Sequence, residues 1–233
     1  MLLQLVRFTL VPSLTLASQE LAQLRSQVFN NGASRQYLSY ITSTQSTSLP
    51  KKRHEICWII MWHKNFTIAN KPAAVGLDRI IQDPATTMLY DFEDSQLEQL
   101  TRGIEAPICE FVSPPQAFIR LSPNAPLTDP ALRASLHKTY TDCYKIQGFV
   151  GGQWTYCLNA NQPEGVALSD GNPLLLNQDN RRLALYFLGW ESIELHQDAC
   201  LTPLFAEEID KLQPWFYNGS GAWYNSFRRY DRQ

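Results

Sequence analysis

The stretch LGWESIELHQD, Leu188 to Asp198, joins an apolar run to an acidic segment that carries a histidine. A second stretch of the same pattern occurs earlier in the chain. ICWIIMWHKNF, residues 56–66, matches ALYFLGWESIE, residues 184–194, at a constant offset of 128 residues, which places Trp62 on Trp190. Few residues are identical, but the apolar and aromatic positions agree. The pattern therefore predicts a structural unit that occurs twice in the chain.

Hydrophobic periodicity and turn residues predict the same order of elements in each half. The expected order is strand, helix, strand, strand, helix, strand. In the first half the elements are expected at 4–11, 18–29, 37–44, 56–62, 68–81 and 88–92. In the second half they are expected at 108–112, 130–145, 153–158, 183–190, 193–212 and 223–229. A βαββαβ unit leaves one face of its sheet bare, and packing two bare faces together would bury both.

This organisation predicts three segments. Residues 1–94 form the first unit, residues 95–105 form a connecting helix, and residues 106–233 form the second unit. The polar segment Asn159–Arg182 is expected to be a long loop, either a lid or binding loop or a surface insertion.

The composition predicts a globular protein and argues against several partners. Hydrophobic residues make up 44% of the chain and charged residues 18%, and the net charge of −2 does not suit a nucleic-acid surface. No apolar run is long enough to cross a bilayer, so no membrane contact is expected. The five cysteines form no CxxC pair, which favours a reduced, cytoplasmic protein without a metal site: Cys57, Cys109, Cys143, Cys157 and Cys200.

Motifs for nucleotide cofactors, P-loops, zinc proteases and hydrolase nucleophiles are absent from the sequence. The four histidines are therefore the natural acid–base candidates, and His196 is the preferred one. It lies in the first turn of the expected last helix, on a stripe with Cys200 that should face the sheet. A helix N-terminus would lower the pKa of its imidazole. The alternative is a histidine that only hydrogen-bonds to a neighbour.

Large aromatic residues near the two matching strand ends are candidates for a binding site. Trp190, Trp62 and Trp58 could wall a pocket for a flat ligand, or fill the end of the sheet. Tyr156 and Tyr186 could donate a hydrogen bond to a developing anion, although tyrosine in a strand is more often part of the core. Two further residues complete the candidate binding set: Cys200 and His63.

The strand end LGWES and the helix IELHQDACLTPLFAEEIDKL resemble the antibiotic-biosynthesis monooxygenase type of the dimeric α+β barrel superfamily. The resemblance is clearest over Leu183–Phe227. It implies an α+β fold of two tandem ferredoxin-like units forming a pseudo-dimeric α/β barrel, like the fused tailoring proteins of fungal secondary metabolism. Proteins of this type often carry a histidine where this chain has Cys200.

The resemblance also implies an activity without a cofactor. The expected substrate is a hydrophobic small molecule, aromatic or polyketide-like, and the preferred reaction is a monooxygenation in which the substrate anion itself activates oxygen. Cyclisation, isomerisation or decarboxylation would need the same acid–base groups. A non-catalytic binder and a haem protein are the remaining alternatives. The chain is expected to be a monomer or a homodimer.

Overall fold

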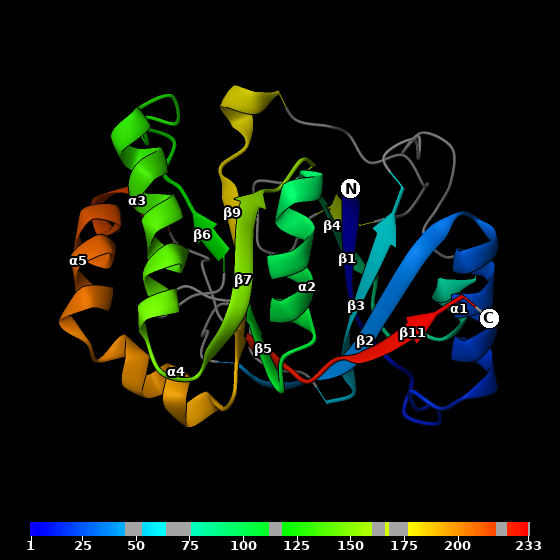
Figure 1. The fold of residues 1–233 in the computed structure, drawn as a ribbon. Helices are drawn as coiled ribbons and strands as arrows, with labels where there is room; N and C mark the ends of the chain where they lie inside the picture. Colours follow the sequence, from blue (N-terminus) through cyan, green and yellow to red (C-terminus); the bar gives the residue numbers. More distant parts are fainter. Residues whose placement is uncertain are drawn as a thin grey trace.

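The computed structural model describes residues 1–44, 53–63, 76–111, 118–159, 166–167, 177–217 and 223–232. Within these ranges the protein is an α+β fold, in which one curled antiparallel sheet carries most of its helices on the outside, while the helix Leu97–Ile104 packs against the core inside the curl (Figure 1). The first half contains β1 (Leu2–Thr9), α1 (Gln19–Asn30), β2 (Ala33–Thr44), β3 (Glu55–Trp62), a 3-10 turn (Leu77–Arg79) and β4 (Thr86–Asp91).

The second half follows a connecting helix, α2 (Leu97–Ile104). It contains β5 (Ile108–Phe111), β6 (Phe118–Arg120), α3 (Pro130–Thr141), β7 (Phe149–Tyr156), β8 (Val166–Ala167), β9 (Leu183–Trp190), α4 (Ile193–Cys200), α5 (Pro203–Leu212), β10 (Trp223–Asn225) and β11 (Arg228–Asp231). The strand β8 lies within the segment expected as a long loop; residues 160–165 and 168–176 are outside the described residues.

The strands of the two halves are arranged in the same order. The order in the first half is β2-β3-β1-β4, and the order in the second half is β7-β9-β5-β10. The short strand β6 pairs with the same edge of β9 as β5 does, further toward the start of β9. The short strand β10 pairs with both β5 and β2, so it joins the halves into one sheet. At the other end, a bridge between Tyr90 and Cys157 brings β4 to the end of β7.

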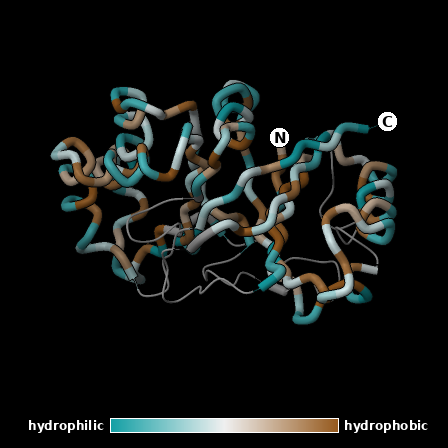
Figure 2. Tube along the Cα trace, turned by 90° about the horizontal axis from the view of Figure 1, so that it is seen from below, coloured by the Kyte–Doolittle hydropathy of each residue, from teal (hydrophilic) through white to brown (hydrophobic). Residues whose placement is uncertain are grey.

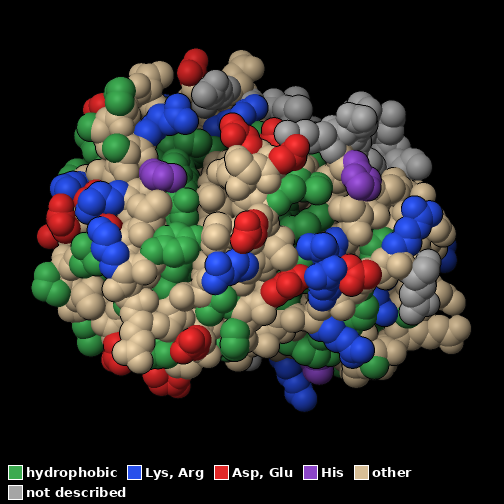
Figure 3. Space-filling model, viewed as in Figure 1, with side chains coloured by type: hydrophobic (Ala, Val, Ile, Leu, Met, Phe, Trp, Pro, Cys, Tyr) green, Lys and Arg blue, Asp and Glu red, His purple; other side chains and the backbone are tan. Residues whose placement is uncertain are grey.

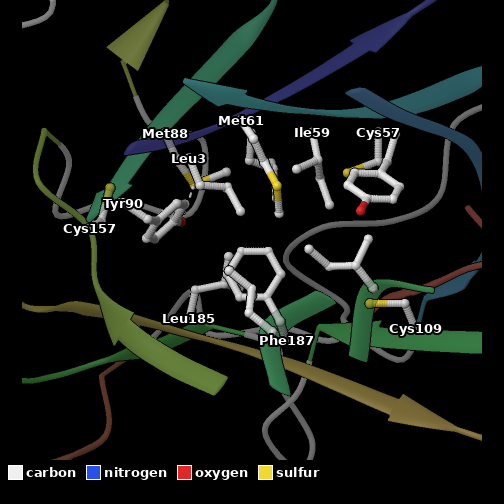
Figure 4. Close-up of a cluster of buried hydrophobic side chains, with 14 of the residues drawn as sticks. Leu3, Cys57, Ile59, Met61, Met88, Tyr90, Cys109, Cys157, Leu185 and Phe187 are labelled. Carbon is white, nitrogen blue, oxygen red and sulfur yellow. Dashed lines mark hydrogen bonds between the residues drawn. The ribbon is translucent and has the colours of Figure 1, made fainter. Parts of the chain in front are cut away.

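Alternation along the strands divides the core into three clusters. One face of β1 and β3, with Leu3, Ile59 and Met61, meets Leu185 and Phe187 of β9 across the inside of the curl (Figure 4). The opposite face of β1 and β3 packs beneath α1, and the outer face of β9 packs beneath α3, α4 and α5. The brown, hydrophobic trace accordingly lies mostly on the strands, while the helices carry the teal, polar residues (Figure 2).

Two expected helices differ from the structure. The predicted helix Ile193–Leu212 is interrupted, because Thr202 caps a new helix by accepting a hydrogen bond from the Phe205 N–H at 3.3 Å and Pro203 occupies its first turn. The predicted helix Ile68–Ile81 lies partly outside the described residues, and from residue 76 onward only the 3-10 turn is present. Pro203 is visible in the sequence, and because proline favours the first turn of a helix, it indicates that one helix ends before it and another begins there.

The repeat itself has a close structural counterpart. The strands β3 and β9 each contain eight residues, all buried, and their first and last residues are related by the offset of 128 found in the sequence. The strands β10 and β11 pair with β2 of the first half.

Candidate functional site

His196 lies beneath the second half's helices, at the corner where β9 leads into α4. Ser192 caps α4 by accepting a hydrogen bond from the Leu195 N–H at 3.2 Å, and one turn of helix then directs His196 onto the sheet. The side chain is 3% exposed, and its ring centroid is 5.1 Å from that of Trp190. The predicted position of His196 facing the sheet is therefore confirmed.

Three polar groups surround the imidazole of His196. Its Nε2 atom is 3.0 Å from Oε2 of Glu110 and 3.1 Å from Sγ of Cys200. Its Nδ1 atom is 3.0 Å from the hydroxyl oxygen of Tyr224. Both ring nitrogens thus face a group that can accept or exchange a proton, on β5, α4 and β10. We call His196, Glu110, Tyr224 and Cys200 the imidazole cluster.

The charges of this cluster are set by burial and by the pairing of His196 with Glu110. Burial alone would lower the pKa of His196, but the Glu110 carboxylate and contacts with Cys200 raise it to about 10. Burial raises the pKa of Glu110, an effect that His196 and the Trp190 indole oppose. The raised pKa favours the protonated form of His196, and an imidazolium 3.0 Å from Glu110 in turn favours the charged form of that carboxyl group. The expected lowering of this pKa by the helix N-terminus is not found, because the closer carboxylate dominates.

Glu110 was not among the residues singled out in the sequence. It is fully buried, and neither carboxylate oxygen has a hydrogen bond of good geometry to the described residues. The available signal was a single charged residue inside the apolar strand ICEF, since an acidic side chain there must be buried with a partner. The partner lies 86 positions along the chain, which local patterns do not reveal.

The tryptophans Trp62 and Trp58 lie in the other half, beneath α1, and are not brought to the imidazole cluster. Their indole N–H groups donate to Gln4 and Gln36, each at 3.1 Å. Both side chains are fully buried, as a structural role requires. Among the predicted wall residues, only Trp190 contacts the imidazole cluster.

Tyr156 and Tyr186 lie beneath α3, beside the stacked ring of Trp154. The hydroxyl of Tyr186 donates to the Leu136 carbonyl at 2.7 Å, and burial raises its pKa well above the usual range. The hydroxyl of Tyr156 is buried without a hydrogen-bond partner among the described residues, and burial raises its pKa to about 12. The tyrosine that contacts His196 is instead Tyr224, which the sequence analysis had not selected.

The remaining candidates are closer to the surface. His63 follows β3 and is exposed, whereas Cys200 is partly buried at the end of α4. Its neighbour Leu201 is 84% exposed, so the α4–α5 junction lies at the surface. A small cavity between α3 and α5, lined in part by Cys143 and Phe205, has room for about 10 Å³. No cluster of three His, Cys, Asp or Glu side chains suited to a metal occurs in the described ranges.

Comparisons with known proteins identify the fold. No family model and no curated protein matches this sequence. Among solved structures, a "putative monooxygenase" of Fusobacterium nucleatum matches with a TM-score of 0.54 at 7% identity, covering 99% of this chain and 94% of that one. An "anthrone oxidase-like protein" matches with a TM-score of 0.51 at 9% identity, covering 99% and 92%. A "putative monooxygenase" of Lactobacillus acidophilus has a TM-score of 0.50 at 9% identity, covering 98% and 93%.

At these identities the likeness shows the fold alone: this chain shares the α+β fold of these structures over nearly its whole length. Within the described residues, no helix is long and apolar enough to cross a membrane.

Proposed function

We propose that this protein is a cofactor-independent enzyme that oxidises a hydrophobic aromatic small molecule, as a tailoring step of secondary metabolism. The observation that carries the proposal is the fully buried Glu110 carboxylate 3.0 Å from the His196 imidazole. Such a pair is costly to bury and is therefore typical of a site that moves protons. The substrate class follows from the same-fold structures, one of which is named anthrone oxidase-like.

The cluster divides the acid–base work between two residues. The substrate is a phenol or an enolisable ketone, and its proton passes to Glu110, whose pKa is raised by burial, which makes its carboxylate a stronger base. His196 stays protonated and its positive charge stabilises the substrate anion. Tyr224, on the other ring nitrogen, holds the orientation of the imidazole. Glu110 thus takes the role that the sequence analysis gave to His196.

The oxidation then uses molecular oxygen and the electron-rich substrate anion alone. The anion transfers electrons to oxygen, and a carbon–oxygen bond forms at the activated carbon. For a methylene carbon such as that of anthrone, one oxygen atom remains as the new carbonyl. The other oxygen atom leaves as water with the two hydrogens lost from carbon. Trp190 supplies an aromatic wall beside the cluster.

The described cavity near the cluster is too small for such a substrate. Its 10 Å³ holds about one water molecule. Binding therefore requires α4 and α5 to move, and their junction at Leu201 and Thr202 is the natural hinge. The same observation favours the second candidate, a non-catalytic scaffold whose packed layers never open.

We further propose that the two halves are tandem ferredoxin-like units that form a pseudo-dimeric barrel within one chain. The shared strand order supports this, as do the equal lengths of β3 and β9. The contacts between halves are also reciprocal. The fourth strand of each half, β4 or β10, meets the second strand of the other, β7 or β2.

The test is oxygen consumption and quinone formation with anthrone, using the wild-type protein, Glu110→Gln and the exposed control His137→Gln. We expect turnover by the wild type and His137→Gln only in the presence of oxygen, and a loss of about 100-fold or more in Glu110→Gln. Turnover without oxygen would indicate a non-oxidative enzyme. Binding of anthrone without turnover would favour the scaffold, and full activity of Glu110→Gln would remove the proposed base.

A further inference from the structure

A second cavity lies between α2 and the strands β2 and β3. It has a volume of about 460 Å³, in the range of small-molecule sites. None of its lining residues belongs to α3, α4, α5 or β9, so it is separate from the candidate site. We call it the α2 cavity.

The inner wall of the α2 cavity is apolar. Met61 of β3 is 3% exposed and belongs to the core cluster inside the curl, while Met1 and Leu97 are partly buried against the same cluster. Figure 3 shows hydrophobic side chains exposed near the middle of this face, with basic and acidic groups around them. Methionine side chains are flexible and polarisable, so this wall can adapt to an alkyl chain or an aryl ring.

The rim of the α2 cavity carries two arginines on opposite sides, Arg35 from β2 and Arg102 from α2. Arg35 donates from Nη1 to the Tyr37 hydroxyl at 3.2 Å, and its Nε atom is 3.8 Å from Asp231. Arg102 is exposed at the rim. Among the lining residues the two arginines outnumber the one acidic residue, Glu98, although Asp231 beside the cavity offsets part of the charge of Arg35.

We propose that the α2 cavity binds a small amphipathic carboxylate. Its alkyl or aryl part lies on Met1, Met61 and Leu97, and its carboxylate lies between Arg35 and Arg102. Guanidinium groups match the planar geometry of a carboxylate and bind it through paired hydrogen bonds. Burial of the ligand's alkyl or aryl part on the apolar wall adds binding free energy that a simple anion, without such a part, does not gain. This site does not depend on the proposed oxidation.

The methionines allow a direct test. The chain has three: Met1 and Met61 line the cavity, while Met88 is fully buried in the core and does not. Protein labelled with ¹³C-methyl methionine is titrated with decanoate below its micellar concentration. The expected result is saturable shifts of the Met1 and Met61 signals, with Met88 nearly unchanged. Decanoate should bind about tenfold more tightly than decanol, and acetate should not produce the shifts.

Two kinds of variant then locate the ligand. Arg102→Ala and Arg35→Ala should each weaken decanoate binding about tenfold and leave decanol binding unchanged. Thr101→Phe, which fills the cavity from the partly buried side of α2, should abolish binding of both. The matched control is Arg133→Ala, an exposed arginine on α3, and it should bind like the wild type.

The proposal is overturned if decanoate and decanol bind equally, if decyltrimethylammonium binds as well as decanoate, or if Thr101→Phe binds normally. Absence of shifts at Met1 and Met61 overturns it directly. Thermal unfolding of each variant distinguishes lost binding from lost structure.

Discussion

The two halves of the molecule place a tryptophan at the same corner but surround it differently. In the first half, the Trp62 indole donates to the neutral amide of Gln4. In the second half, Glu110 holds the place of Gln4, because Gln4 pairs with Ile60 and Glu110 pairs with Leu188, its match at the offset of 128. Trp190 therefore lies near a carboxylate, and His196 supplies the counter-charge.

This difference separates the residues that the fold requires at each corner from the residues that it does not require. A tryptophan beside a Gln or Glu side chain is common to both corners and can be explained by packing, together with the hydrogen bond of the Trp62 indole in the first half. The Glu110–His196 pair occurs in one corner only and brings a burial cost that the corner at Trp62 avoids. The first half has its own buried ion pair, Arg7–Glu55 at 2.6 Å, at the opposite end of β1 and β3. The comparison thus assigns Trp190 to the framework and the Glu110–His196 pair to a special role.

The largest expected effect comes from removing one member of the charged pair. His196→Leu leaves the Glu110 carboxylate buried without its partner, and we expect a loss of about 3–5 kcal/mol in the free energy of unfolding at pH 8. Urea unfolding measures this loss. It should shrink at pH 4, where Glu110 takes up a proton. A loss that is equal at both pH values would show that packing, and not charge, is responsible.

The converse change places a carboxylate in the uncharged corner. Gln4→Glu puts an acid beside Trp62, and the first half has Ile68 where the second has His196. We expect a destabilisation of about 2–4 kcal/mol at pH 8, relieved at low pH as the buried acid becomes neutral. If Gln4→Glu leaves the free energy of unfolding unchanged at pH 8, the corner at Trp62 can hold a buried carboxylate without a histidine partner, which contradicts the comparison.

A smaller effect should appear in the pH dependence of stability. The folded pKa of His196, about 10, is above its unfolded value of 6.5, so its contribution is complete below pH 6.5 and is lost as the pH rises through about 10. The raised pKa of Glu110 likewise lowers the free energy of unfolding as the pH rises above 4.5. Glu110→Gln should flatten the fall in unfolding free energy between pH 7 and 10, by on the order of a few kcal/mol. Subtracting the variant's unfolding free energy from that of the wild type at each pH removes the contribution of the other titrating groups. Parallel curves for the two proteins would contradict the raised pKa of His196.

The smallest effects are expected beneath α3, where the two predicted tyrosines lie. Tyr186→Phe removes the bond to the Leu136 carbonyl and should cost about 1 kcal/mol. Tyr156→Phe removes a buried hydroxyl that has no partner among the described residues, and should be neutral or slightly stabilising. Thermal unfolding distinguishes them. Loss of turnover in either, with stability intact, would return that tyrosine to the catalytic site.

Much of the fold could be predicted because its signals are local. The bounds of β9 and the start of α3 at Pro130 each follow from a few neighbouring residues. The pairing of β10 with β2 and the contacts of Glu110 with His196 and Tyr224 join residues far apart in the chain. Sequence periodicity carries no information on such contacts, so the predicted site contained His196 but not its partners.

The position of β10 between β5 and β2 has a consequence for how the protein is made. One edge of β2 pairs with β3 and the other with β10 and β11, so the nascent first half exposes this second edge until residues 223–231 have been synthesised. Unpaired edges of this kind can pair with other chains. Chaperone demand during synthesis should therefore depend more on the last strands than on the stability of the finished fold.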